Sequence, residues 1–376
     1  MIFSINRDVL LNHLIIVQKG LPVKTPLPIL FAIKLEVNED HLLLTTSNTD
    51  IAIQELVDDA SLSIKETGRC AIPGRYLIEI MRKITSQRIE FEMIEDRIII
   101  IKADRSEFKL RLMEVDDYPD VDFLDLDEPI SLDSQLFKSI IRETNFATAV
   151  SEKRPILTGV NFKYEDSTLY CVATDSYRLS QKNVKLRAQN QDFNLVIPSK
   201  SLEELGKILD ASDDQIDLYI NPNKVLFKLN NTLFQTRLLE GVYPDTQRII
   251  PTEFPVSIPF NKEELLQAVE RVSLLSPRDR EINYNIIKMI LREDHVVEIS
   301  STNSEIGDAK EVVIPSSDTQ GPIIKIAFSS KYLVDALKSF NSNEVTLNFA
   351  GEVKPFVIKG SLDQDLLHLI LPVRID

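Results

Sequence analysis

Residue types that commonly carry catalytic chemistry are scarce in this chain. Among its 376 residues there is no tryptophan, and there are only two cysteines, four histidines and ten glycines. No P-loop, G-x-G-x-x-G or G-x-S-x-G motif occurs, and the histidines show no metal-ligand spacing. These absences disfavour an enzyme, a nucleotide-binding protein and a metalloprotein, so we expect no catalytic residues, no cofactor and no metal.

The two cysteines do not form a recognisable site. Cys70 and Cys171 each stand alone inside an apolar, strand-like stretch, without a C-x-x-C spacing. We expect two buried thiols, with a disulfide or a nucleophile as the alternatives.

Long apolar runs are also missing. No stretch of about 18 apolar residues is present, which predicts that nothing spans a membrane. The N-terminus lacks the architecture of a signal peptide, which favours the cytoplasm. The net charge of −15 argues against a nucleic-acid partner unless the basic residues gather on one surface.

Acidic residues are concentrated in one run. Glu114–Glu128 holds eight carboxylates, but their spacing is irregular. We interpret the run as a solvated connector between domains rather than as a metal site.

What the chain does contain is a repeat. Three short apolar strand patterns each end in a hydroxyl residue followed by Asn or Asp, a pair that forms turns with its own backbone. The pairs are Ser47-Asn48, Thr174-Asp175 and Thr302-Asn303, separated by 127 and 128 residues. A constant interval close to one third of the chain indicates one unit present three times.

Other landmarks keep nearly the same interval. Asn6, Asp133 and Asn261 each precede an amphipathic segment, where such a side chain can cap a helix. The segment Arg111–Glu114, followed by Tyr118–Asp120, returns as Arg237–Glu240 followed by Tyr243–Asp245. We therefore predict three tandem α+β domains, residues 1–126, 127–252 and 253–376, each with two helices packed on antiparallel sheets.

The second helix of each repeat is predicted to carry a pair of basic residues. The pairs are Arg75/Arg82, Lys200/Lys207 and Lys331/Lys338, always seven residues apart and opposite an apolar helix face. A solvated helix face explains any one pair. Three equal pairs in an acidic protein favour one basic surface for sequence-independent contact with a phosphate backbone.

Four segments together resemble the family of bacterial DNA polymerase III beta subunits, the sliding clamps. They are TPLPIL at residues 25–30, ATDSYRL at 173–179, YPD at 243–245 and LPVR at 371–374, and the likeness covers the whole chain. The resemblance implies a head-to-tail homodimeric ring of six domains around duplex DNA, with helices lining the hole. Its role would be to tether the replicative polymerase, which is a topological and not a catalytic function.

The resemblance also implies a pocket between the second and third domains that binds short peptide motifs. Its apolar residues would accept Leu and Phe side chains, and Arg and backbone groups would orient the peptide. Its predicted residues are Leu157, Thr174, Ser176, Tyr177, Arg178, Leu179, Pro244, Arg248, Ile249, Val353, Pro355, Leu369, Ile370, Leu371, Pro372, Val373 and Arg374. Family members usually carry Gly where this chain has Ser176, so the turn there is expected to differ slightly.

Two further surfaces follow from the same resemblance. The dimer interface would include Phe108, Leu110, Leu274 and Leu275, for which a place in the buried core is the alternative. The DNA-binding residues would be Lys24, Arg75, Arg82, Lys153, Arg154, Lys200, Lys207, Arg278, Arg280 and Lys331.

The implied partners are duplex DNA, a second copy of the chain, the polymerase catalytic subunit and a clamp loader. Other clamp-motif proteins, such as repair polymerases, ligase and mismatch repair proteins, would share the pocket. The implied location is the nucleoid and replisome in the cytoplasm. A three-domain scaffold that binds peptides without encircling DNA remains the alternative function.

Overall fold

The computed structural model describes residues 1–123, 128–151, 153–186, 192–209, 214–276 and 285–374. The chain separates into two compact units, one of residues 1–138 with 200–238, and one of residues 139–199 with 239–376. The units do not follow the sequence repeats, because in each unit an eight-stranded sheet pairs strands from two neighbouring repeats. Among the described residues, no helix is both long and apolar enough to cross a membrane.

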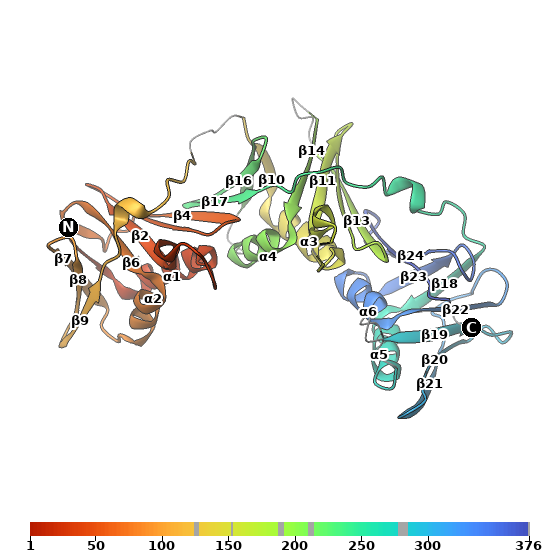
Figure 1. Ribbon diagram of the computed structural model, residues 1–376. Helices are drawn as coiled ribbons and strands as arrows, with labels where there is room; N and C mark the ends of the chain where they lie inside the picture. The colour runs from red at the N-terminus through yellow and green to blue at the C-terminus, as the bar shows by residue number, and fades with distance from the viewer. Residues whose placement is uncertain (124–127, 152, 187–191, 210–213, 277–284, 375–376) are drawn as a thin grey trace. The chain divides into compact units, whose positions relative to one another are not determined.

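The first unit contains two antiparallel sheets and the helices α1 (Arg7–Val17) and α2 (Gly74–Lys83), which lie together beside β2, β4 and β6 in Figure 1. Its first nine strands are β1 (Ile2–Asn6), β2 (Ala32–Val37), β3 (Leu42–Ser47), β4 (Ile51–Val57), β5 (Ser63–Glu66), β6 (Gly68–Pro73), β7 (Arg88–Ile94), β8 (Ile98–Ala103) and β9 (Ser106–Arg111). The others are β10 (Ile130–Asp133), β15 (Gln215–Ile220), β16 (Lys224–Leu229) and β17 (Thr232–Arg237).

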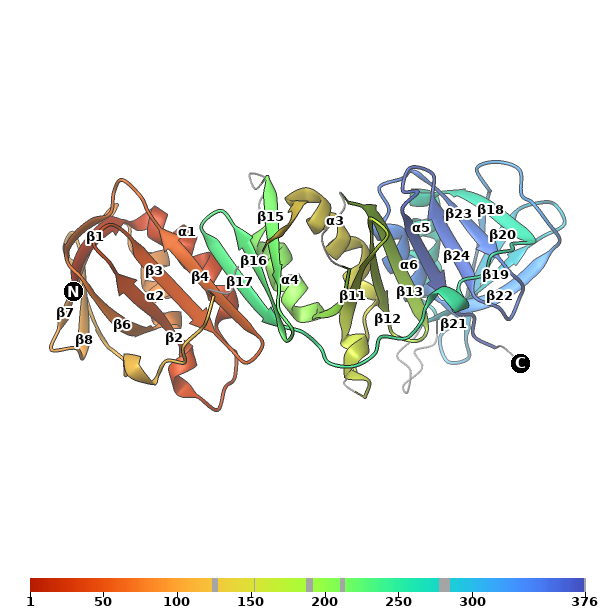
Figure 2. The same ribbon diagram turned by 90° about the horizontal axis from the view of Figure 1, so that it is seen from above.

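The eight-stranded sheet of this unit runs β10-β15-β16-β17-β4-β3-β2-β6, and Figure 2 shows β17 beside β4. These two strands come from different repeats and pair in register, with Phe234 opposite Ile53. The five-stranded sheet runs β5-β1-β7-β8-β9, so β9 is an edge strand. Phe3 of β1 and Phe91 of β7 are both buried in the core at this sheet, with their rings stacked and the ring centroids 4.6 Å apart.

The helices α3 (Ser134–Thr144) and α4 (Ser199–Ile208) belong to the middle repeat, and the division between the units passes through them. The second unit adds α5 (Lys262–Ser273) and α6 (Ser330–Ser339), which pack on each other. Its strands are β11 (Gly159–Glu165), β12 (Thr168–Thr174), β13 (Arg178–Lys185), β14 (Phe193–Pro198), β18 (Val256–Asn261), β19 (Ile286–Leu291), β20 (Val297–Asn303), β21 (Gly307–Val313), β22 (Ile324–Ser329), β23 (Glu344–Phe349), β24 (Phe356–Gly360) and β25 (Leu366–Ile370).

The second unit repeats the plan of the first. Its eight-stranded sheet runs β14-β11-β12-β13-β25-β24-β23-β18, and the junction between repeats is the pair β13 and β25. There Arg178 lies opposite Ile370, and Ser180 lies opposite His368. The four-stranded sheet runs β21-β20-β19-β22, which leaves β21 as an edge strand.

Local sequence explains where the first helix of each repeat begins. Asn6 accepts hydrogen bonds from the backbone N–H groups of Asp8 and Val9, and Asn261 does the same for Glu263 and Glu264. Asp133 accepts one from the N–H group of Leu136 at 2.7 Å. The three predicted caps are thus present, each satisfying N–H groups that have no partner within the helix.

The second helices bury the predicted apolar faces. Leu77 and Met81 of α2, Leu202 and Leu205 of α4, and Leu333 and Leu337 of α6 are fully buried. The spacing predicts Leu77, Ile80, Met81 and Ile84 for the apolar face of α2, and there one residue differs, because Ile78 is buried and Ile80 only partly so. The carboxylates of the acidic connector are exposed where the structure describes them, but Tyr118 and Phe123 are buried and anchor it to the first unit.

Candidate functional sites

The residues predicted for a peptide pocket all lie within the second unit, and two of them, Leu179 and Leu369, lie on one face of the junction between β13 and β25. Leu179 and Leu369 pair across these strands and form a buried apolar cluster with Val172 and Val357. Partly buried side chains lie against this cluster; they are Tyr243, Ile250, Phe254, Leu367 and Leu371. The face is therefore apolar and incompletely covered, as a site for apolar peptide side chains must be.

Several predicted residues that are close in sequence to members of this cluster are exposed. Tyr177 is 49% exposed, Ile249 47% and Val353 71%. Pro244 and Arg374 are also exposed, and Pro355, Pro372 and Val373 are partly covered. Arg248 is highly exposed and forms an ion pair with Asp245 at 2.9 Å.

Several other members of the predicted set are buried, and Thr174 at 5% exposure is one of them. Side chains alternate along a strand, so Arg178 and Ile370 point away from Leu179 and Leu369. Ile370 belongs to the core of the third repeat, and Arg178 is only 7% exposed. Leu157 is buried, with 4% exposure, in the short helix Pro155–Thr158.

The turn that joins β12 to β13 is held by its own side chains. Asp175 accepts hydrogen bonds from the backbone N–H groups of Tyr177 and Arg178 at 2.9 and 3.0 Å. The Thr174 hydroxyl accepts one from the N–H group of Ser176 and donates one to the Arg178 carbonyl. This is the hydroxyl-Asx turn that the repeat predicts.

Tyr243 packs against the apolar cluster, although the set of pocket residues predicted from the sequence omits it. Its hydroxyl oxygen accepts a hydrogen bond at 3.1 Å from the N–H group of Thr174, and burial raises the pKa of this phenol well above its usual value. The repeat of the Tyr-Pro-Asp motif at Tyr118 and Tyr243 is the sequence feature that could have identified it. In the structure both tyrosines pack against an apolar cluster, Tyr118 buried and Tyr243 partly buried.

The predicted DNA-binding residues are all exposed where the structure describes them. Lys24, Lys153 and Arg154 lie in loops or turns, and Arg278 and Arg280 lie outside the described residues. In each basic pair on the second helices, the second residue forms an ion pair. Arg82 pairs with Glu79, Lys207 with Glu203 and Glu204, and Lys338 with Glu270.

The first members, Arg75, Lys200 and Lys331, form no ion pair within the described part of the chain. Each lies in the first turn of its helix, where the helix dipole disfavours a cation. Helix stability therefore does not explain them. A helix N-terminus together with a cation does suit an anion such as a phosphate.

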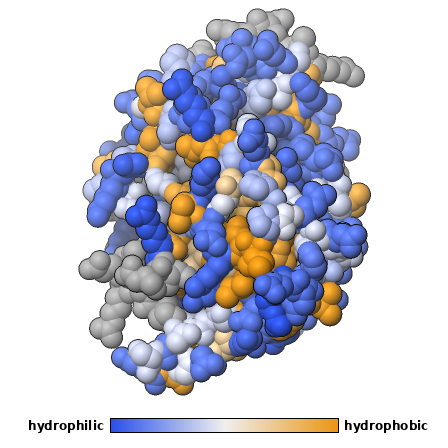
Figure 3. Space-filling view, turned by 90° about the vertical axis from the view of Figure 1, so that its right-hand side faces the viewer, coloured by the Kyte–Doolittle hydropathy of each residue, from blue (hydrophilic) through white to orange (hydrophobic). Residues whose placement is uncertain are grey.

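The predicted dimer-interface residues are not in the core of this chain. Leu274 is 79% exposed at the end of α5, and Phe108, Leu110 and Leu275 are partly exposed. Figure 3 shows the face at the right-hand side of Figure 1, where apolar residues gather amid hydrophilic ones. Other exposed apolar residues of the third repeat include Ile306, at 67%, and Ile314, at 69%.

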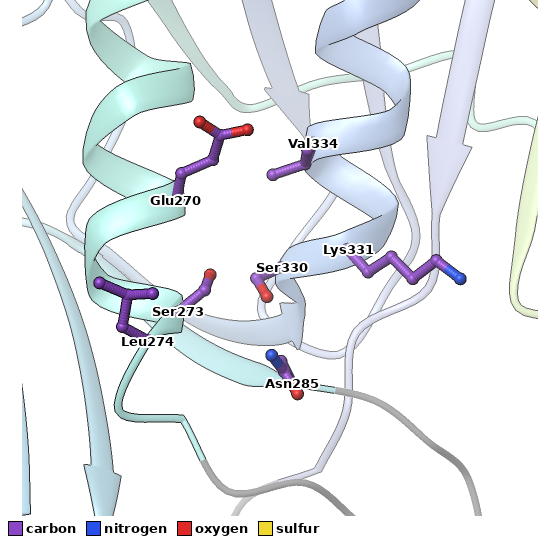
Figure 4. A pocket seen from close by; sticks show the side chains of 7 residues that line it. All are labelled: Glu270, Ser273, Leu274, Asn285, Ser330, Lys331 and Val334. Carbon is purple, nitrogen blue, oxygen red and sulfur yellow. The ribbon is translucent and has the colours of Figure 1, made fainter.

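A hollow of about 480 Å³ lies between the end of α5 and the beginning of α6 (Figure 4). Ser273 and Ser330 face each other across it, while the Lys331 side chain extends away. It is lined by Glu270, Ser273, Leu274, Asn285, Ser330, Lys331 and Val334. The hollow thus adjoins one predicted interface residue and one predicted phosphate contact.

The two cysteines are free and buried, as expected. Burial raises the pKa of the Cys70 thiol to about 12 and also raises the pKa of Cys171, so neither is a ready nucleophile. Within the residues that the structure describes, no group of three His, Cys, Asp or Glu side chains is placed to hold a metal ion.

Comparison with known proteins assigns the family. Models of the N-terminal, central and C-terminal domains of the DNA polymerase III beta subunit match residues 1–122, 131–245 and 247–374. The chain is 38% identical to proteins named beta sliding clamp in Staphylococcus epidermidis and Staphylococcus aureus, over 99% of both chains. The sliding clamp structure of Bacillus subtilis is 37% identical, with full coverage of both chains and a TM-score of 0.94.

Three tandem clamp domains make up this chain, and it belongs to the DNA polymerase III beta subunit family, the beta sliding clamps. Members of this family are processivity factors of DNA replication rather than enzymes. The family prediction made from the sequence is confirmed.

Ser176 is the residue of the pocket turn that we expect to be strained. Its φ is +80°, in the region that favours glycine. We predict that Ser176→Gly raises the free energy of unfolding by about 1 kcal/mol, because it removes this strain without removing a hydrogen bond of the turn. Thermal unfolding followed by circular dichroism measures the change. Ser361→Gly, at an exposed serine without positive φ, is the control and should not stabilise; equal effects of both substitutions would contradict the prediction.

Proposed function

We propose that two copies of this chain close head to tail into a ring around duplex DNA. In this arrangement the DNA is held by topology, while weak phosphate contacts permit the ring to slide. A clamp loader would open one interface and close it around DNA. The work of the protein would take place at the nucleoid, in the cytoplasm.

The observation that carries this proposal is that two edge strands, β9 and β21, correspond by repeat to the strands that pair at the junctions inside the chain. Inside the chain, each junction between repeats is an eight-stranded sheet, whereas the sheets that end in β9 and β21 have five and four strands. β9 corresponds by repeat to β17 and β25, and β21 corresponds to β4 and β13. β9 and β21 are therefore the equivalents of the strands that pair at the junctions inside the chain, and their outer edges are available to pair between two chains.

The repeat also predicts the register of this pairing. Thr236 lies opposite Ile51 and Phe234 lies opposite Ile53 at the first junction. The equivalent residues place Leu110 of one copy opposite Ile306 of the other, and Phe108 opposite Asp308. Leu274 and Leu275 would be covered at the same interface, which explains an otherwise costly exposure of apolar side chains.

We further propose that the apolar cluster around Leu179 and Leu369 binds short peptides of the replicative polymerase and of other clamp-motif proteins. Its support is an apolar floor with exposed Tyr177, Ile249 and Val353 near it. Such an arrangement suits an extended or turned segment that inserts Leu and Phe side chains. The pocket recruits partners, and the ring keeps them at the DNA.

The interface is tested by substituting two leucines. We expect Leu274→Ala with Leu275→Ala to shift the monomer–dimer equilibrium toward monomer by about tenfold or more, because apolar burial of two side chains is reduced. Light scattering and sedimentation at low protein concentration measure the mass. Leu362→Ala is the matched control, since Leu362 is also 79% exposed but lies outside the proposed interface. An unchanged dissociation constant in the double variant would rule out this interface.

The phosphate surface is tested by comparing the two members of each basic pair. We expect Arg75→Ala, Lys200→Ala and Lys331→Ala together to weaken retention on DNA and to reduce its dependence on salt, because each lost phosphate contact releases about one counterion fewer. Retention of loaded protein on circular DNA is measured over a range of salt concentrations. The comparison variant combines Arg82→Ala, Lys207→Ala and Lys338→Ala; because these cations already have carboxylate partners, we expect a smaller loss of retention, although Arg82 and Lys207 belong to the predicted DNA-binding set. Equal salt dependence for wild type and the first variant would contradict the assignment.

A further inference from the structure

The guanidinium of Arg178 is buried although the residue belongs to the pocket turn. Its Nε donates a hydrogen bond to Asp175 Oδ2 at 3.1 Å, and its Nη1 donates one to Asp335 Oδ2 at 2.6 Å. Its Nη2 donates one to the backbone carbonyl of Phe146. Each of the three nitrogens thus donates to a protein group, one in the turn itself, one on α6 and one in the segment at Phe146.

Aromatic rings complete the surroundings of this cation. The guanidinium carbon lies 4.5 Å from the ring centroid of Tyr332 and 5.4 Å from that of Phe146. A guanidinium stacks its flat face on aromatic rings while its N–H groups donate within its plane; a lysine ammonium also has three donors but no flat face. His368 packs on Phe146 nearby, and burial, together with the charge of Arg178, lowers its pKa to about 3. The histidine is therefore uncharged and does not repel the arginine.

Asp335 connects this cation to a different surface. It lies on α6, four residues after Lys331 and three before Lys338, so the three side chains share one helix face. Its carboxylate would otherwise be available to pair with those lysines. The bond to Arg178 instead ties α6 to the first residue of β13.

The contacts of Arg178 also reach the exposed part of the turn. Asp175, which accepts from the Arg178 side chain, accepts from the backbone N–H groups of Tyr177 and Arg178 as well. The Tyr177 carbonyl in turn accepts a hydrogen bond at 2.9 Å from the N–H group of Leu371. Any shift of the guanidinium is thereby passed to Tyr177 and Leu371, two residues of the proposed pocket.

We propose that Arg178 is a positioning residue, which fixes the pocket turn to α6 and to the segment at Phe146, so that peptide affinity depends on side chains that the peptide does not touch. This inference rests on the peptide pocket proposed above. Arg178 would then act on the peptide through the turn rather than by contacting it. The helix α6 would hold both the pocket turn, through Asp335, and Lys331.

Asp335→Asn tests the proposal because Asp335 lies outside the pocket. The amide retains the size of the side chain and one acceptor oxygen but loses the charge that strengthens the bond to Arg178. The probe is a fluorescein-labelled peptide of about ten residues with adjacent Leu and Phe near its carboxyl end. Binding is measured by fluorescence anisotropy at a temperature well below that at which the variant unfolds. We expect the dissociation constant of Asp335→Asn to be about tenfold higher than that of the wild type.

Two further variants separate positioning from general stability. Asp294→Asn makes the same change at a partly exposed carboxylate that pairs with Arg292 at 2.9 Å, and it should leave the dissociation constant unchanged. Asp335→Glu keeps the charge but moves the carboxylate, and should raise the dissociation constant by about threefold even if Asp335→Asn fails to fold.

The outcomes distinguish the inference from the function on which it rests. If the wild-type chain does not bind the peptide, the proposed pocket is wrong. If the wild type binds and a folded Asp335 variant binds within twofold of it, Arg178 does not position the pocket, even where the variant unfolds at a lower temperature.

Discussion

Antiparallel pairing between strands of different repeats is the interaction on which the rest of this structure depends. At one junction β17 pairs with β4, and at the other β13 pairs with β25. Each junction turns two half-sheets into one continuous sheet, so backbone groups that would form an exposed edge are satisfied. The same geometry leaves β9 and β21 at the ends of the two remaining sheets, each paired on one side only. The proposed ring would close by the same kind of antiparallel strand pairing, between β9 of one copy and β21 of the other.

The second junction does more than join repeats. Because side chains alternate along β13 and β25, one face presents Leu179 and Leu369 for the proposed pocket, and the other presents Arg178 to α6. A polar anchor and an apolar binding surface are thus built from neighbouring residues of the same strand. In our proposal, peptide recognition on one face of this sheet is thereby connected to the support of a basic helix on the other face.

Much of this organisation is readable in the sequence, because a repeat turns weak local signals into strong ones. The Asx caps at Asn6, Asp133 and Asn261 and the apolar faces of the second helices were predicted from spacing alone. The burial of Arg178 was not predicted. The residues of a contiguous motif point to opposite faces of a sheet, and the sequence does not reveal which of them point away from the pocket. Nor does local pattern show that Tyr118 and Phe123 are buried within an acidic connector, because their partners are distant in sequence.

The central claim is that the chain holds DNA by encircling it, and retention on circular and linearised plasmids tests this most directly. The protein is loaded on nicked circles by a clamp loader with ATP, and the DNA is then left circular or cut once. The account predicts that protein remains on the circles and leaves from the ends of the linear molecules, because only a topological link distinguishes the two. Equal loss from both forms would contradict it, and would favour a scaffold that binds peptides without encircling DNA.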